Sequence, residues 1–312
     1  MIQTEILTIH NFICFDMNLR YLIFVITTIL ITSCSSDEDD KTSDKQSDII
    51  FDAHLNEFTG KSSLSPINEG VKATFFAFKS GEQTPVAQGN YYANKTGQMI
   101  GINNYIMYLL PENYNFYGIS QNDTALFNPL DNFISNNLKN GVDYLWANIN
   151  NQTLTGASTL LSITFNHIAS QLYFEMESGN NVTINSVDSV LVQTPEENVK
   201  LNLFNSQLPQ SDGFNTKFTP MTVSGLNSSF YILPVNTSVP LKTIFYLKIN
   251  NQSNETLYAL NISLPDGGYQ SGKSYRYKLS ISETEIIIKA FTVSDWIIND
   301  NTGTPIYPDD ET

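Results

Sequence analysis

The stretch LYALNISLPDGGYQSGKSYRYKLSIS (residues 257–282) decides which kind of fold the chain adopts. Its central part, residues 267–274, matches the phosphate-loop pattern G-x-x-x-x-G-K-[ST], in which a strand runs into a loop that opens a helix. Here the residues after Ser274 alternate, so that Tyr275, Tyr277 and Leu279 share one face of an extended chain. The stretch therefore predicts a strand after a turn, and it argues against a nucleotide site.

Alternating segments of this kind continue along most of the chain. They are rich in β-branched and aromatic residues and are separated by clusters of Gly, Pro, Asn and Asp. Strands divided by such turns are typical of sandwiches and barrels. We therefore predict an all-β protein in which many of the 16 tyrosines and 19 phenylalanines fill the space between packed sheets. Only residues 131–141, DNFISNNLKNG, favour a short helix.

The charge of the chain argues against nucleic acid as a partner. The 312 residues carry a net charge of -15, and only two arginines occur, Arg20 and Arg276. Binding to phosphates requires clustered Lys and Arg side chains. We predict that neither nucleic acid nor a nucleotide binds.

The sequence also contains no catalytic or metal-binding pattern. The histidines His10, His54 and His167 lack the H-x-x-x-H or H-E-x-x-H spacing of a zinc site, and G-x-S-x-G does not occur. Glu175 and Glu177 are explained better as solvated strand charges than as a glycosidase pair. The prediction is a non-enzymatic protein without a catalytic residue, metal ion or cofactor.

The N-terminal sequence predicts export and lipid attachment. From Met17, which we take as the start, MNLRYLIFVITTILITSC has one arginine, an apolar run shorter than a membrane span, and small residues before Cys34. Residues 31–34, ITSC, resemble a bacterial lipobox, which predicts a signal peptide over residues 1–33 and acylation, including palmitate, at Cys34. A plain signal peptide with an incidental cysteine is the alternative.

A polar tether is predicted to follow the lipid. Residues 34–47 are polar and charged apart from Cys34 and cannot form a core. The acidic run at residues 37–40 is either a solvated linker or a signal that resembles those directing lipoproteins to the outer face of the outer membrane. Beyond the tether, the chain length predicts two domains.

Four stretches, in order along the chain, resemble the fimbrillin family, the lipoprotein-precursor pilins of type V pili. They are YIMYLLPENYNFYGIS (105–120), VDYLWANI (142–149), LLSITFNHIASQLYFEME (160–177) and GGYQSGKSYRYKLSISETEIIIKAFTVSDW (267–296), with a weaker fifth, SSFYILPVN (228–236). The resemblance implies two tandem transthyretin-like β-sandwich domains, residues 48–155 and 156–312. It also implies that His167 is a structural residue in the first strand of the second domain and that Trp296 closes the last strand.

The resemblance further implies assembly by strand addition. Family members lose their first strand to a protease, and a partner's strand fills the vacated groove through main-chain hydrogen bonds. Here residues 48–58 would be that strand and residues 59–70 the cut loop. The best-known members are cut after an arginine, and none lies between Cys34 and Arg276. Either another protease acts, with Lys61 as the candidate processing site, or the strand is retained and the protein is a monomer or anchor.

The leading interpretation is a structural or adhesive subunit, or an anchor, of a fimbrium at the cell surface. Its implied partners are other pilin subunits, the outer membrane and surface ligands of host or bacterial cells. The alternative is a glycan-binding surface lipoprotein of a carbohydrate-uptake system.

The triplets DTA and DSV resemble an O-glycosylation pattern, with Thr124 and Ser189 as acceptors.

Overall fold

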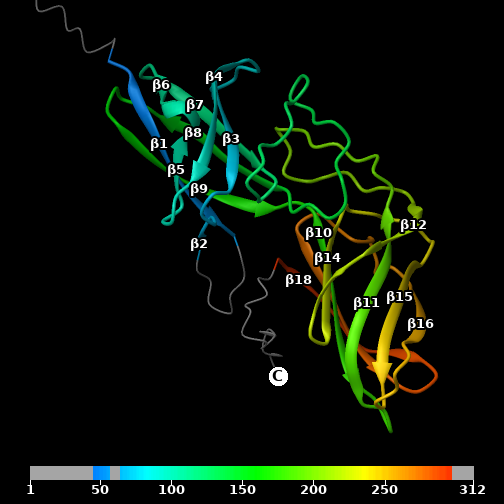
Figure 1. The fold of residues 1–312 in the computed structure, drawn as a ribbon. Helices are drawn as coiled ribbons and strands as arrows, with labels where there is room; N and C mark the ends of the chain where they lie inside the picture. Colours follow the sequence, from blue (N-terminus) through cyan, green and yellow to red (C-terminus); the bar gives the residue numbers. More distant parts are fainter. Residues whose placement is uncertain (1–44, 57–63, 297–312) are drawn as a thin grey trace, which may run out of the picture. The chain divides into compact units, whose positions relative to one another are not determined.

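The computed structural model describes residues 45–56 and 64–296 (Figure 1). Nearly all of its regular elements are strands, which confirms the predicted all-β fold. Within these two ranges the one helical element is the 3-10 turn η2 (Ile102–Asn104). None of the described residues form a helix with the length and apolarity needed to cross a membrane.

The N-terminal strands form a nine-stranded sheet that closes on itself. Its path is β2-β1-β5-β4-β3-β7-β8-β9, β6 pairs with β1, and a further pairing of β1 with β9 joins the two sides. The strands are β1 (Ser47–Leu55), β2 (Ser65–Pro66), β3 (Lys72–Lys79), β4 (Pro85–Ala93), β5 (Gln98–Gly101), β6 (Met107–Leu109), β7 (Asn113–Ser120), β8 (Leu145–Thr153) and β9 (Thr159–His167).

Strand β3 is buried on both faces. Phe75 packs in the core that the closed sheet surrounds, whereas Phe76 and Phe78 pack in a second core with loop residues such as Leu201. A strand that is buried on both faces is expected to show a continuous apolar run instead of alternation. The run FFAF in residues 75–78 has this property.

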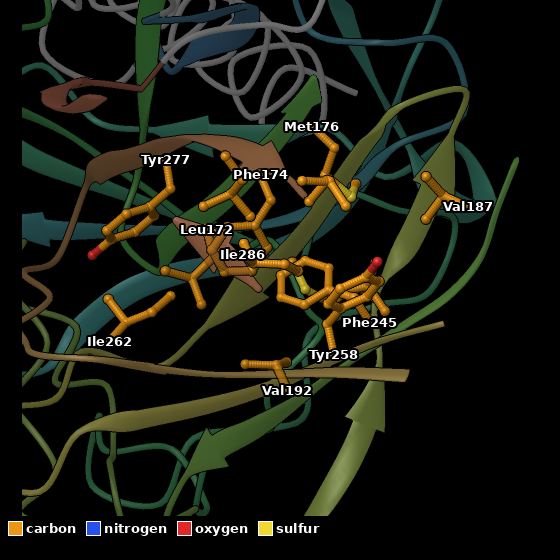
Figure 2. Close-up of a cluster of buried hydrophobic side chains, with 14 of the residues drawn as sticks. Leu172, Phe174, Met176, Val187, Val192, Phe245, Tyr258, Ile262, Tyr277 and Ile286 are labelled. Carbon is orange, nitrogen blue, oxygen red and sulfur yellow. The ribbon is translucent and has the colours of Figure 1, made fainter. Parts of the chain in front are cut away.

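The C-terminal strands form a sandwich of two sheets. One has the order β13-β14-β10-β17-β18 and the other the order β12-β11-β15-β16. Their facing side chains make one apolar core, in which the ring of Phe174 contacts those of Phe245 and Tyr277 (Figure 2). The strands are β10 (Ser170–Ser178), β11 (Ile184–Pro195), β12 (Phe214–Pro220), β13 (Thr222–Ser224), β14 (Asn227–Ile232), β15 (Leu241–Ile249), β16 (Thr256–Ile262), β17 (Lys273–Ile281) and β18 (Ile286–Asp295).

The turn before β17 explains the glycines of the phosphate-loop match. Gly267 and Gly268 have φ values of 80° and 73°, in the left-handed region that favours glycine. A Cβ atom on Gly268 would lie 2.2 Å from the carbonyl oxygen of Val235. Strand β17 begins at Lys273, as the alternation predicted, so the motif is a turn between strands.

Two buried tyrosines in the sandwich lead to a testable pH dependence. The hydroxyl oxygens of Tyr269 and Tyr277 lie 2.8 Å apart, and burial raises the pKa of both groups above the usual value. As the pH rises, the unfolded chain therefore loses these protons at a lower pH than the folded chain does. The two hydroxyl groups stabilise the fold fully below a pH of about 10, and this stabilisation is lost as the pH rises further. We expect urea unfolding to show a free energy that falls above about pH 10. A chain carrying Tyr269→Phe and Tyr277→Phe should show a smaller fall, and an equally steep fall would contradict this assignment.

The helix predicted for residues 131–141 is wrong, because this segment contains no helix. Asn132 and Phe133 adopt positive φ values of 48° and 63°. Ser135 N–H donates to the carbonyl of Leu201 at 2.9 Å. Long-range main-chain bonds thus take the place of the i to i−4 bonds that a helix would need.

The domain division after residue 155 stays a prediction. Strand β9 pairs with β1 and β8, so the chain passes from the first sheet to the sandwich at Ile168 and Ala169. His167, expected in the first strand of the second domain, is the last residue of β9.

Candidate assembly site around strand β1

Strand β1 is inserted between two sides of the first sheet. On one side it pairs in parallel with β9, from Ile49 opposite Thr159 to Leu55 opposite Phe165. On the other side, successive parts of β1 pair antiparallel with β6, β5 and β2. The first strand predicted within residues 48–58 is thus confirmed as Ser47–Leu55. Since β1 completes the sheet, its removal would leave a groove with unpaired main-chain groups along both sides.

The groove that β1 fills is apolar. Along β1, buried inward side chains alternate with half-buried outward ones, the apolar inward ones being Ile49, Phe51, Ala53 and Leu55. The fully buried ring of Phe51 stacks on Phe75 with centroids 4.1 Å apart and meets Tyr91 edge-on at 5.5 Å. An extended segment with an apolar residue at every second position is what such a groove binds.

Polar contacts hold both ends of β1. At its start, Ser158 Oγ donates to a carboxylate oxygen of Asp48 at 2.9 Å. At its end, the Asn56 N–H donates to the carbonyl of Phe165 at 2.8 Å. These contacts fix where the strand begins and ends in the groove.

Several predicted residues lie outside the described parts of the chain. They include Cys34 and the signal peptide, most of the tether, and Lys61, so lipid attachment and processing stay predictions. β1 ends at Leu55 and β2 begins at Ser65, so the loop predicted to be cut, residues 59–70, extends into β2. Of the two glycosylation candidates, Thr124 is exposed after β7, whereas Ser189 is half-buried within β11.

His167 belongs to a buried polar network. Its Nδ1 donates to Asp143 Oδ1 at 2.7 Å, and Asn122 Nδ2 donates to Asp143 Oδ2 at 2.7 Å. The imidazole stacks on Trp296 with centroids 4.2 Å apart, and Trp296 in turn stacks on Tyr231. The network connects the end of β9 to the residue after β18, which accounts for a structural role of His167 and Trp296.

We expect Asp143→Ala to lower the free energy of unfolding by about 3 kcal/mol. The substitution removes the acceptor of two hydrogen bonds, one donated by His167 and one by Asn122. Each buried donor left without an acceptor costs about 1–3 kcal/mol. Urea unfolding of the variant measures this loss. The matched control is Asp212→Ala, at an exposed carboxylate, which should change stability little. Equal effects of the two substitutions would contradict the importance of the network.

A cavity of about 680 Å³ lies beside this network. Its lining includes the amide side chains of Asn56, Asn166, Gln207 and Gln270. Asn56 Nδ2 already donates to Asn166 Oδ1 at 2.8 Å. Amide groups both donate and accept hydrogen bonds, so this lining suits a ligand with many hydroxyl groups.

The histidines do not form a metal site in the described part of the chain. His54 lies on the outward face of β1, with Nε2 3.2 Å from Asp52 Oδ2. Across residues 45–56 and 64–296, no group of three or more His, Cys, Asp or Glu side chains is arranged to hold a metal ion.

The sequence did not indicate the partners of β1 or of His167. Asp143 precedes His167 by 24 residues, and no spacing rule connects an isolated aspartate with an isolated histidine. The apolar alternation in β6 and β9 predicted strands there, but not that β1 would lie between them. Only the folded chain shows these pairings.

The comparisons with known proteins agree with this architecture. A family model described as fimbrillin-like matches residues 65–296. Proteins assigned to cell adhesion from Bacteroides uniformis and Bacteroides ovatus each have a TM-score of 0.63 and 13% identity, and cover 81% and 82% of this chain and 99% of their own. A further such protein, from Bacteroides fragilis, has a TM-score of 0.51 and 13% identity over 82% of this chain and 99% of its own. No curated protein matches the sequence.

At this identity the structural likeness shows the fold alone. The family match, in contrast, covers more than half of the chain and includes strands of both the closed sheet and the sandwich. This chain therefore belongs to the fimbrillin-like family.

Proposed function

We propose that the protein is a cell-surface lipoprotein, acylated at Cys34, that acts as a structural or adhesive subunit, or as the anchor, of a pilus assembled by strand addition. The observation that supports this most is the position of β1, the first described strand, in an apolar groove between β9 on one side and β5 and β6 on the other. A partner strand with the same alternation can take its place. Membership of the fimbrillin-like family supports pilin subunits as partners. The protein acts by binding, not by catalysis.

Limited proteolysis tests the assembly step. We expect a cut in the loop after β1 to release β1 and to produce filaments in negative-stain microscopy, whereas uncut protein stays dispersed. A synthetic peptide with the β1 sequence, SDIIFDAHL, should block filament formation, because it refills the groove. The same peptide with Phe51→Asp is the control, since a buried carboxylate opposes binding. Cut chains that lose β1 and remain monomeric would rule out strand addition at this groove.

Mass spectrometry of protein from the cell surface distinguishes a processed subunit from an anchor. A chain starting at Ser62 would identify Lys61 as the processing site, and Lys61→Ala should abolish this fragment. An acylated N-terminus at Cys34 in every molecule would instead favour the retained strand and the anchor role. The Cys34→Ser chain should leave the membrane fraction, because no acyl chain holds it there.

Glycan binding is a second candidate function, favoured by the amide-lined cavity of about 680 Å³. Titration calorimetry with soluble oligosaccharides of glucose, xylose and mannose tests it. A chain with Asn166→Ala and Gln270→Ala should lose the binding of any sugar that the unchanged chain binds. Absence of binding to all three classes, or unchanged binding in the variant, would count against this site.

A further inference from the structure

Strand β18 is an open edge of the sandwich. It is the outermost strand of its sheet and pairs only with β17 in the described residues. Three of its apolar side chains lie on the side of the sheet that faces the core, because they are opposite the buried residues Leu279, Tyr277 and Tyr275. They are nevertheless 39–48% exposed, and they are Ile288, Phe291 and Val293. The facing sheet therefore does not fully cover this edge.

The other edges of the sandwich are protected in ways that β18 is not. Strand β13 has only three residues, and β12 contains Lys217 and Pro220. Short length and proline are two usual means of preventing edge-to-edge pairing, and the lysine of β12 has a counterpart in β18, Lys289. Strand β16 buries its inward Tyr258 and Ile262. Strand β18, in contrast, has ten residues, contains no proline and leaves apolar inward side chains accessible.

The sequence of this edge is complementary to itself. Residues 289–295 read KAFTVSD. When two copies run antiparallel with Thr292 opposite its own counterpart, Phe291 lies opposite Val293, and Lys289 lies opposite Asp295. The first pair joins apolar side chains that both face inward. The second brings Lys289 to Asp295, a carboxylate that within its own copy lies 2.6 Å from Lys273 Nζ, so opposite charges meet there in a shared ion pair.

The backbone of β18 permits this register. The irregularity in its pairing with β17 falls at Lys289, at the end of the self-complementary segment, so residues 290–295 follow a regular ladder. The free main-chain groups of one copy then meet those of the other along this ladder. Such an arrangement places a twofold axis at Thr292 and uses the same surface on both partners.

We propose that two copies of this chain associate through β18, antiparallel and centred on Thr292, so that the five-stranded sheet of one copy continues into that of the other. Phe291 and Val293 of each copy then become covered by the partner's β18. The site lies in the sandwich and does not involve β1, so it is independent of strand addition at the first sheet.

Cross-linking tests the register. In a chain with Cys14→Ser and Cys34→Ser, which removes both native thiols and the acylation site, Thr292→Cys is expected to form a disulfide-linked dimer under mild oxidation. The matched control is Thr216→Cys, an exposed threonine on the edge strand β12, which should stay uncross-linked. Equal cross-linking of the two cysteines would overturn the proposed register.

Sedimentation velocity tests the association itself. The Cys14→Ser and Cys34→Ser chain should sediment as a dimer at high concentration. Thr292→Lys, which puts two lysines opposite each other, should raise the dimer dissociation constant by about tenfold or more. Thr216→Lys should leave it unchanged, and matching circular dichroism and unfolding curves show that both variants are folded. A monomer at every concentration would overturn the proposal, and so would a dimer that tolerates Thr292→Lys. The first outcome is the one expected if the residues after Trp296 cover the edge or if the edge binds a different subunit.

Discussion

A chain from which residues 46–56 are deleted is expected to lose the cooperative folding of its first sheet. The deletion removes the buried side chains Ile49, Phe51 and Leu55 and separates β9 from β5 and β6. At about 1.5–3 kcal/mol for each side chain, the lost burial amounts to about 5–9 kcal/mol. This is comparable with the whole stability of a typical domain, about 5–15 kcal/mol. The exposed groove and its unpaired edges should also make the chain self-associate.

Addition of the β1 peptide in trans is the measurement that isolates the groove. We expect SDIIFDAHL to restore a cooperative thermal transition and to return the mass by light scattering to that of the intact chain at the same concentration, because the deleted chain still contains the sequences of the other strands of the sheet. The Phe51→Asp peptide should restore neither. If the deleted chain unfolds with the same midpoint as the intact one, β1 is not an integral part of the sheet.

The Phe51→Ala substitution in the intact chain is expected to lower the free energy of unfolding by about 3–5 kcal/mol, as truncations of fully buried Phe to Ala do. Phe51 has no exposed surface, and its ring contacts Phe75, Tyr91 and Phe116. The three remaining rings lie on three different strands, β3, β4 and β7, and cannot collapse readily around the space left behind. Denaturant unfolding, with fluorescence and circular dichroism as separate probes, gives the value.

Ile50→Ala is the internal control for this substitution. Ile50 is the next residue of β1 and its half-buried side chain is on the outward face of the strand. The loss there should be clearly smaller, because less apolar surface leaves contact. Equal losses at positions 50 and 51 would mean that β1 does not sit in the groove with the observed register.

Local alternation predicted most strands correctly. The segment after Ser274 became β17, and the segment around Phe51 became β1, because side chains in an extended chain alternate between two faces. The same reasoning rejected the phosphate loop, since no residue pattern of period 3.6 followed Lys273. These features depend only on neighbours in the sequence.

The prediction of a helix for residues 131–141 shows where local patterns are insufficient. Phe133 has a positive φ, and Ser135 donates to Leu201, a residue far along the chain. A main-chain group buried in a loop takes whichever partner the fold provides. No property of the eleven letters alone identifies that partner.

By itself the sequence determined the all-β fold, most of the strands, and the apolar face of β1. The reason is that the two-residue period of a strand depends only on residues that follow one another in the sequence. The tertiary structure alone decided that β1 lies between β9 and β6, that His167 meets Asp143 and Trp296, and that β18 is the outermost of the described strands in its sheet. Such pairings join residues that are distant in the chain, and they are selected by the packing of the whole core. Alternation makes a segment a strand, but it does not choose the strand's neighbours.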